Sequence, residues 1–264
     1  MNALLIDAGN SRLKWASLRG GRLGTLHSAA WDAAGLPALT ARIAAQAGHP
    51  DSVLVGCVAG VTVQRTLRGA LRAAHLPAPQ FAVSRRQQGG VSNAYRWPEQ
   101  LGVDRWLALL AARALYPSES VCIVSVGTAL TVDLLDNQGR HLGGAIVPGP
   151  ALMVDSLLNS TADIRRRAGG AARSPRSSAQ RSLFARDTRG ALSAGSLHAT
   201  VALTEYALSR AQEAVAHAPR LLLTGGGARD LQRALGTRDL RVQLHRVDDL
   251  VLRGLAVLAQ QESG

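Results

Sequence analysis

The stretch LLIDAGNSRLK, residues 4–14, decides how the fold begins. Its apolar residues Leu4–Ile6 predict a buried strand that enters a tight turn at Asp7, Gly9 and Asn10, and a second strand follows this turn. The tip of such a hairpin presents backbone N–H groups, an amide, a hydroxyl and a carboxylate, which can hold a phosphate and its metal ion. On these residues alone a plain structural turn is the simpler interpretation, because short glycine motifs are common by chance.

The same pattern occurs again in CIVSVGTALTVDLL, residues 122–135, with its turn at Gly127 and Thr128. A second pair of matching stretches is SVLVGCVAG, residues 52–60, and RLLLTGGGA, residues 220–228; each predicts a strand, a glycine turn and then a helix. The chain is therefore predicted to consist of two similar α/β halves. Their boundary is expected near residues 115–121, where Pro117 follows the helical run at 105–115. The apolar segment 249–261 predicts a packed helix.

The composition of the 264 residues, 47% of them hydrophobic, is that of a globular protein with a substantial core. No basic leader precedes an apolar segment near Met1, and no apolar run approaches about 18 residues. We therefore expect neither a signal peptide nor a membrane span, and a cytoplasmic location. Cys57 and Cys122 stand in apolar stretches, which favours buried strand positions without a disulfide.

Positive charge is concentrated in one part of the chain. Lysine and arginine number 30 against 18 acidic residues, a net charge of +12. Between residues 164 and 190, eight arginines against the single acid Asp187 contribute +7 (eight minus one): Arg165, Arg166, Arg167, Arg173, Arg176, Arg181, Arg186 and Arg189. This segment lacks apolar periodicity and predicts a loop. A solvated surface loop is the simpler interpretation, and an anion-gathering lid or a nucleic-acid patch is the alternative.

Five motifs in order make the chain resemble the type III pantothenate kinases of the acetate and sugar kinase/Hsp70/actin superfamily. They are DAGNSRLK at 7–14, GVDR at 102–105, GTALTVD at 127–133, GGAIVPG at 143–149 and TGGGA at 224–228. The resemblance covers nearly the whole chain. It implies an α/β fold of two similar ribonuclease-H-like domains facing a central cleft, with domains at residues 1–117 and 118–264.

The resemblance also implies a function, namely the ATP-dependent phosphorylation of pantothenate, the first step of coenzyme A biosynthesis, by a homodimer. Two groups of residues are carried over by position. The ATP-binding group, which includes Asp7 as a ligand of magnesium, is Asp7, Ala8, Gly9, Asn10, Ser11, Arg12, Leu13, Lys14 and Thr128. The pantothenate-binding group, with Asp104 as general base, is Tyr95, Gly102, Val103, Asp104, Arg105 and Thr188.

The residues of GVDR also have a local interpretation. Asp104 stands where the N-cap of a helix is expected, and a cap alone would explain an aspartate there. Arg105 in the first helical turn opposes the helix dipole, a small cost that is easier to understand if it binds a carboxylate. Lys14, the only lysine of the chain, suits phosphate neutralisation, although a lone strand lysine is more often simply exposed.

One position departs from the family pattern. Relatives often carry an aspartate two residues before the glycine of the GT in the second phosphate motif, where it helps to hold a monovalent cation such as K⁺ or NH₄⁺. This chain has Ser125 there, and a neutral hydroxyl is a poorer cation ligand than a carboxylate. We therefore expect weaker dependence on a monovalent cation.

A second hypothesis is a non-enzymatic regulator of the same fold that binds nucleic acid or protein through the arginine-rich segment. Such a protein would bind nucleic acid with a steep salt dependence. The sequence shows no helix-turn-helix or zinc module, and only 3% of its residues are aromatic. These features favour the kinase.

Overall fold

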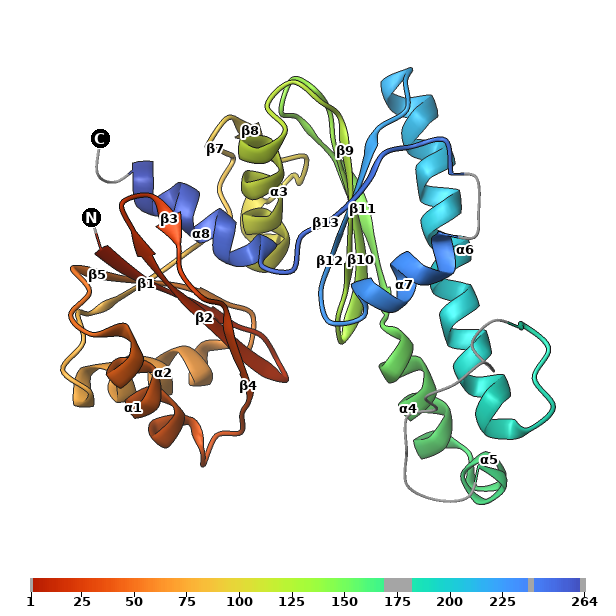
Figure 1. Cartoon of the computed structure of the whole chain (residues 1–264), viewed down its shortest axis with the longest axis horizontal. Helices are drawn as coiled ribbons and strands as arrows, with labels where there is room; N and C mark the ends of the chain where they lie inside the picture. The colour runs from red at the N-terminus through yellow and green to blue at the C-terminus, as the bar shows by residue number, and fades with distance from the viewer. Residues whose placement is uncertain (1, 169–181, 237–239, 262–264) are drawn as a thin grey trace. The chain divides into compact units, whose positions relative to one another are not determined.

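The computed structural model describes residues 2–168, 182–236 and 240–261 (Figure 1). The chain forms two compact units. Unit 1 consists of Met1–Ser118, Asn137–Gly143 and Asp249–Gly264, and unit 2 consists of Glu119–Asp136 and Gly144–Asp248. The chain thus leaves unit 1, returns to it briefly, and returns again at its end.

The sheet of unit 1 is built around the predicted first hairpin. Strand β1 (Asn2–Ala8) pairs antiparallel with β2 (Arg12–Arg19), and β5 (Ser52–Cys57) lies parallel to β1 on its other side. The sheet continues with β6 (Pro79–Phe81) parallel to β5, while β3 (Arg22–Leu23) and β4 (His27–Ala30) both pair with β2. The strand order is β3-β2-β1-β5-β6. A small ribbon, β7 (Gln87–Gln88) with β8 (Val91–Ser92), lies apart.

Helices cover both faces of this sheet because its central strands are apolar on both sides (Figure 1). On one face, α1 (Leu36–Ala47) and α2 (Val61–Ala73) pack on alternate residues of β1, such as Leu4 and Ile6. On the other face, α3 (Val103–Leu115) and α8 (Leu250–Gln261) contact β5 at Gly56. A short 3-10 helix, η1 (Pro98–Gln100), precedes α3.

Unit 2 contains the second hairpin. Strand β9 (Val121–Val126) pairs antiparallel with β10 (Ala129–Leu135), and β12 (Arg220–Thr224) lies parallel to β9. With β11 (His141–Pro148) and β13 (Leu244–Arg246) the order is β11-β10-β9-β12-β13. Among the residues that the structure describes, four helices belong to this unit: α4 (Pro150–Ser160), α5 (Ala162–Arg167), α6 (Thr188–Val215) and α7 (Ala228–Leu235). Buried residues of α6 and α7, such as Val201 and Leu231, pack on β9 and β12.

Both predicted hairpins and both predicted strand–glycine–helix segments are therefore confirmed, and each sheet places them in the same order. The helices expected at residues 105–115 and 249–261 are also present, as α3 and α8. Cys57 and Cys122 are buried strand residues with free thiols, and burial together with Asp133 raises the pKa of the Cys122 thiol to about 12. No helix in the described part of the chain is long and apolar enough to cross a membrane.

Two local predictions are wrong. Asp7 is not in the turn but inside β1, because the hairpin ladder continues as far as the pair Ala8–Leu13. The segment from 164 to 190 is not a loop throughout, since α5 continues to Arg167 and α6 begins at Thr188. The Asp187 carboxylate caps α6 by accepting the N–H of Gly190 at 2.8 Å, which explains the helix start. Arg173, Arg176 and Arg181 lie outside the described residues.

Candidate active site

Asp7 stands near the carboxyl end of β1, in the middle of the unit 1 sheet. Its cross-strand neighbours are Lys14 on β2 and Gly56 on β5, and the residue is half-buried. Burial raises the pKa of the Asp7 carboxyl to about 6, while the Lys14 ammonium lowers this pKa and the Asp104 carboxylate raises it. The two carboxylates that the sequence singled out are therefore close enough to repel each other.

The packing of α3 on the sheet explains why Asp104 comes near Asp7. Gly56 of β5 lies directly below α3, since a Cβ at this glycine would lie 2.8 Å from Cδ1 of Leu107. Beside α3, on the same face of the sheet, lies α8, where the α-carbon of Gly254 lies against the backbone of Leu107. Helix α3 is thus held by both the sheet and α8, and its first turn carries Asp104 toward the end of β1.

Asp104 is not the N-cap of α3, contrary to the sequence prediction. The helix begins at Val103 with Gly102 as N-cap, and no side chain caps it. Asp104 lies instead in the first turn, where its Oδ1 accepts the N–H of Arg105 at 2.8 Å. A carboxylate in a first turn interacts favourably with the helix dipole, but this gain is modest. Helix capping therefore no longer explains this aspartate.

Arg105 is the most deeply buried arginine of the site, with only 5% of its surface exposed. Its Nη1 donates a hydrogen bond to the hydroxyl of Tyr95 at 2.8 Å, and its guanidinium lies 5.6 Å from the centre of the Tyr95 ring. The ring of His141 in turn stacks on the ring of Tyr95, with centroids 6.0 Å apart and an interplanar angle of 17°. A guanidinium fixed in this way has the fork geometry that binds carboxylates.

His141 is the site residue that sequence reasoning missed. It begins β11 and is buried, and the segment that carries it belongs to unit 1. The backbone of its neighbour Arg140 forms an isolated parallel β-bridge with that of Ser92, which stands two residues beyond the β7–β8 turn. Gly139 packs so tightly on Gly90 that a Cβ there would overlap the Gly90 carbonyl oxygen. These contacts are long-range, so no local pattern in the sequence could have indicated them.

The hairpin tip between β1 and β2 is exposed and consists of Asn10, Ser11 and the adjoining Arg12. The Gly9 N–H donates to the Arg12 carbonyl at 3.1 Å and closes the turn. Two further hydrogen bonds connect the turn to residues outside the hairpin: Trp31 Nε1 donates to the Gly9 carbonyl, and Arg12 Nε donates to Ser28 Oγ, each at 3.0 Å. Ala8 and Leu13 are buried core residues, so these two could offer a ligand only their backbone.

In unit 2, three sequence motifs meet at the end of β9. Thr128 is exposed in the β9–β10 turn, and its carbonyl accepts the N–H of Gly149 at 2.8 Å. Gly149 lies so close to this turn that a Cβ would overlap the Gly127 carbonyl oxygen. From the other side the Gly227 N–H donates to the Val126 carbonyl at 3.0 Å. The GT, GGAIVPG and TGGGA motifs are thus parts of one local structure.

The predicted site residues are distributed over both units. Unit 1 brings together the side chains of Asp7, Lys14, Asp104, Arg105 and Tyr95. Gly102 and Val103 stand at the start of the helix that carries Asp104. Thr128 and Thr188 belong to unit 2, where Thr188 is the first residue of α6.

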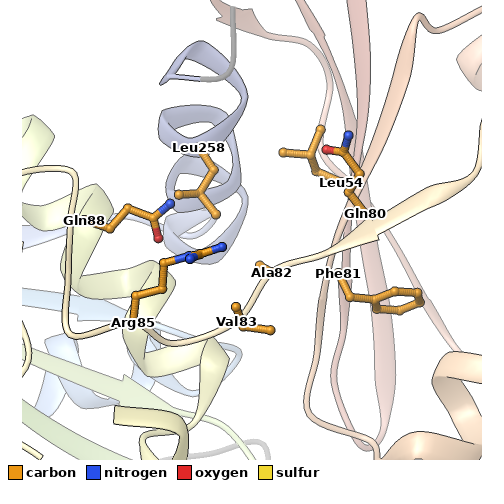
Figure 2. Close-up of a pocket in the computed structure, with 8 residues that line it drawn as sticks. All are labelled: Leu54, Gln80, Phe81, Ala82, Val83, Arg85, Gln88 and Leu258. Carbon is orange, nitrogen blue, oxygen red and sulfur yellow. The ribbon is translucent and has the colours of Figure 1, made fainter.

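A separate small cavity of about 60 Å³ lies in unit 1, between the carboxyl-terminal part of α8 and the β6 edge of the sheet (Figure 2). Figure 2 shows Arg85 and Gln88 on one side of it and Leu54 on the other, with Leu258 from α8 above. None of the predicted site residues lines this cavity. It is therefore distinct from the site around Asp104.

Comparisons of the sequence with known proteins match it to one family. The family model described as type III pantothenate kinase matches residues 3–210. A type III pantothenate kinase of Nitrosococcus oceani is 35% identical over 264 residues, which cover 98% of this chain and 94% of the relative.

Solved structures share the fold. A protein of Campylobacter jejuni, described as a conserved putative Baf family transcriptional activator, has a TM-score of 0.60 at 19% identity and covers 99% of this chain and 100% of its own. A ROK family glucokinase of Streptomyces griseus, solved with glucose and AMPPNP, has a TM-score of 0.54 at 12% identity, with 99% and 100% coverage. The fold is thus the α/β fold of the ROK kinases. On the family model and the full-length relative together, the chain belongs to the type III pantothenate kinase family.

Proposed function

We propose that this protein transfers the γ-phosphoryl group of ATP to the hydroxyl of pantothenate, forming 4′-phosphopantothenate, the first step of coenzyme A biosynthesis. Membership of the family over nearly the whole chain supports this activity. The observation that carries the assignment to particular residues is the meeting of Asp7 and Asp104 at one end of the unit 1 sheet, beside the buried Arg105. The same family membership makes a purely regulatory, nucleic-acid-binding role the less favoured hypothesis.

In the proposed reaction Asp104 takes the proton of the pantothenate hydroxyl. The hydroxyl oxygen forms a bond to the γ-phosphorus, the bond between this phosphorus and the β,γ-bridging oxygen breaks, and ADP leaves. Phosphoryl transfer needs mainly positioning and charge stabilisation, and a general base adds a further factor. Arg105 binds the carboxylate of pantothenate, and Tyr95 holds the guanidinium in place through the 2.8 Å hydrogen bond.

The donor set around Asp7 fits magnesium held together with ATP. Within residues 2–168, 182–236 and 240–261 no group of three or more His, Cys, Asp or Glu side chains could bind a metal ion alone. Magnesium in kinases needs no such group, because one or two carboxylates and the phosphates of the substrate supply its ligands. Burial and, to a smaller extent, the Asp104 carboxylate raise the pKa of Asp7, and a cation beside the two carboxylates would relieve their repulsion. When bound, the ion would neutralise charge on the phosphate oxygens.

The remaining assignments rest on the motifs. The hairpin residues Asp7–Lys14 would contact the phosphates of ATP through backbone N–H groups, hydroxyl and ammonium. Thr128 is assigned to ATP, and Gly102, Val103 and Thr188 are assigned to pantothenate, by their positions in the family pattern. The same proposal includes a weaker dependence of turnover on K⁺ or NH₄⁺, because Ser125 stands where relatives often carry an aspartate.

Three wider properties are also proposed. The matching strand orders of the two units support an origin by duplication of a ribonuclease-H-like domain. In this proposal the two ancestral domains correspond to residues 1–117 and 118–264. In the folded chain, unit 1 also contains two later segments, Asn137–Gly143 and Asp249–Gly264. A homodimer and a cytoplasmic location remain predictions from the family, and light scattering of the purified protein would measure the first.

A substrate panel tests the proposed function. Purified protein is mixed with ATP, magnesium and one small hydroxy acid at a time, and ADP release is measured together with the mass of the product. Pantothenate alone should trigger ADP release and gain one phosphoryl group. The matched control is pantothenate with hydrogen in place of its primary hydroxyl, which should bind without turnover. ADP release with another acid, or none with pantothenate, would refute the assignment.

A further inference from the structure

Gly102 occupies the N-cap of α3 although its backbone does not need glycine. Its φ of −52° and ψ of 132° lie in a region open to every L-residue. Ser, Thr, Asp or Asn would cap the helix better, because their side chains accept a first-turn N–H. The Gly102 carbonyl makes an ordinary helical bond, accepting the Trp106 N–H at 3.0 Å. The reason for glycine must therefore lie in the space around its α-carbon.

That space is taken by the carboxylate of Asp104. A Cβ on residue 102 would lie 2.7 Å from Asp104 Oδ1, whereas its next contacts, with Arg105 Cδ and Asp104 Cγ, would be at 3.9 Å. A non-bonded carbon and oxygen do not approach to 2.7 Å, so one methyl group would force this oxygen to move. The same oxygen accepts the Arg105 N–H at 2.8 Å, a bond that helps to hold it in its present position.

We propose that Gly102 is a positioning residue for phosphoryl transfer, because the absence of a side chain leaves the Asp104 carboxylate where it takes the proton of the substrate hydroxyl. This inference rests on the proposed function, in which Asp104 is the base. The end of a short side chain can move at little cost to the fold. Catalysis is more sensitive, since a displacement of about 1 Å in a reacting group can cost roughly 100-fold in rate.

The test is Gly102→Ala in the full-length chain. We expect kcat to fall roughly 10- to 100-fold while the KM for pantothenate changes by less than about threefold and the melting temperature is unchanged. The matched control is Gly69→Ala, an exposed glycine within α2 whose Cβ would have no atom within 4 Å, and its kcat should equal that of the unchanged protein. In an Asp104→Asn background, Gly102→Ala should cause no further loss, because both changes act on one group.

Several results would overturn the proposal: an unchanged kcat, a rise in KM alone, or the same fold-loss in the Asp104→Asn background. A crystal structure of the Gly102→Ala variant gives a readout independent of turnover, in which Asp104 Oδ1 should have left the Arg105 N–H. If it still accepted that N–H at the original distance, the steric argument would be wrong. Failure of the proposed function would look different, because the unaltered protein would then form no phosphopantothenate whatever the position of Asp104.

Discussion

Asp104 offers the most direct test of catalysis at the scale of single residues. Asparagine in its place keeps an Oδ1 that can accept the Arg105 N–H, so the first turn of α3 should survive. It cannot take a proton, and we expect kcat of Asp104→Asn to fall roughly 10²- to 10⁴-fold with a smaller change in KM. Steady-state kinetics and a thermal melt measure both properties. A variant that melts like the unchanged protein and turns over at a comparable rate would end the general-base assignment.

Asp7→Asn should lose activity with magnesium and ATP yet gain stability at neutral pH. The pKa of Asp7 is about 6 in the folded protein against 3.8 ordinarily, so the folded state binds more protons between these values and its stability falls as pH rises. A shift of about two units corresponds to about 3 kcal/mol, and for a half-buried group we expect about 1–2 kcal/mol. Scanning calorimetry from pH 4 to pH 8 should show the gain above pH 6 and its disappearance near pH 4.

The control for this experiment is Asp230→Asn. Asp230 lies on α7 in an exposed ion pair with Arg233, so its replacement should change the melting temperature little. A lower melting temperature for Asp7→Asn at pH 7.5 would contradict the expectation. It would mean that the attraction between Asp7 and Lys14 outweighs the cost of burial.

Ser125 determines the expected response to monovalent cations. It is half-buried on β9, and its register partners on β10 and β12 are Thr131 and Thr224, so three neutral hydroxyl-bearing residues lie in one row across the sheet. Neutral oxygens hold a cation more weakly than a carboxylate. Turnover should therefore be similar in sodium, potassium and ammonium buffers, and Ser125→Asp should introduce a preference. A strict requirement for potassium or ammonium in the unchanged protein would show that other groups form the site.

The residues of the site were predictable where a local motif marked them and not elsewhere. Asp7, Asp104 and Arg105 stand in short motifs, whereas His141 depends on contacts with segments far away in sequence. The cap prediction for Asp104 was wrong by two residues, because a sequence shows that an acid begins a helix but not whether it stands at the cap or in the first turn. Gly102, which does stand at the cap, carries no side-chain signal.

At the scale of elements, the packing of α8 on α3 depends on one glycine. A Cβ at Gly254 would lie 2.1 Å from the carbonyl oxygen of Leu107, and backbone cannot move aside as a side chain can. Gly254→Ala should therefore separate the two helices and destabilise the protein by about 1–3 kcal/mol or more. Urea denaturation measures this loss. Gly69→Ala in α2 should instead stabilise by about 0.5–1 kcal/mol, and equal stability of the two variants would show that α8 can shift freely.

Elements were predicted well where hydrophobic periodicity and glycine turns agreed. Both hairpins were recognised because strands of period two flank a glycine, and α3 because its apolar residues recur at helical spacing. The arginine-rich segment was predicted as loop because α5 is only six residues long and three of them are arginines, which leaves no apolar periodicity to recognise. The alternative interpretation of this segment as an anion-gathering lid falls mostly outside the described residues and stays a prediction.

At the scale of the whole molecule, the path of the chain was the least predictable feature. The sequence of residues 249–261 predicts a packed helix, but it does not indicate which strands this helix covers. In the structure it closes unit 1, to which residues 137–143 also belong. The contact of α8 with α3, such as that of Gly254 with Leu107, joins residues more than a hundred positions apart, and a single sequence carries no local record of it.

This path predicts that unit 1 cannot complete its folding without the end of the chain. Truncation after Asp248 removes four buried leucines from the sheet face that also carries α3: Leu250, Leu252, Leu255 and Leu258. Burying each contributes about 1.5–3 kcal/mol, so the loss of at least about 6 kcal/mol is comparable to the whole stability of a typical domain. Hydrogen exchange should show loss of protection in β1, β5 and α3 of the truncated chain. Adding a peptide of residues 249–261 should restore it, whereas protection equal to that of the full chain without the peptide would show that α8 is dispensable for the fold around Asp7 and Asp104.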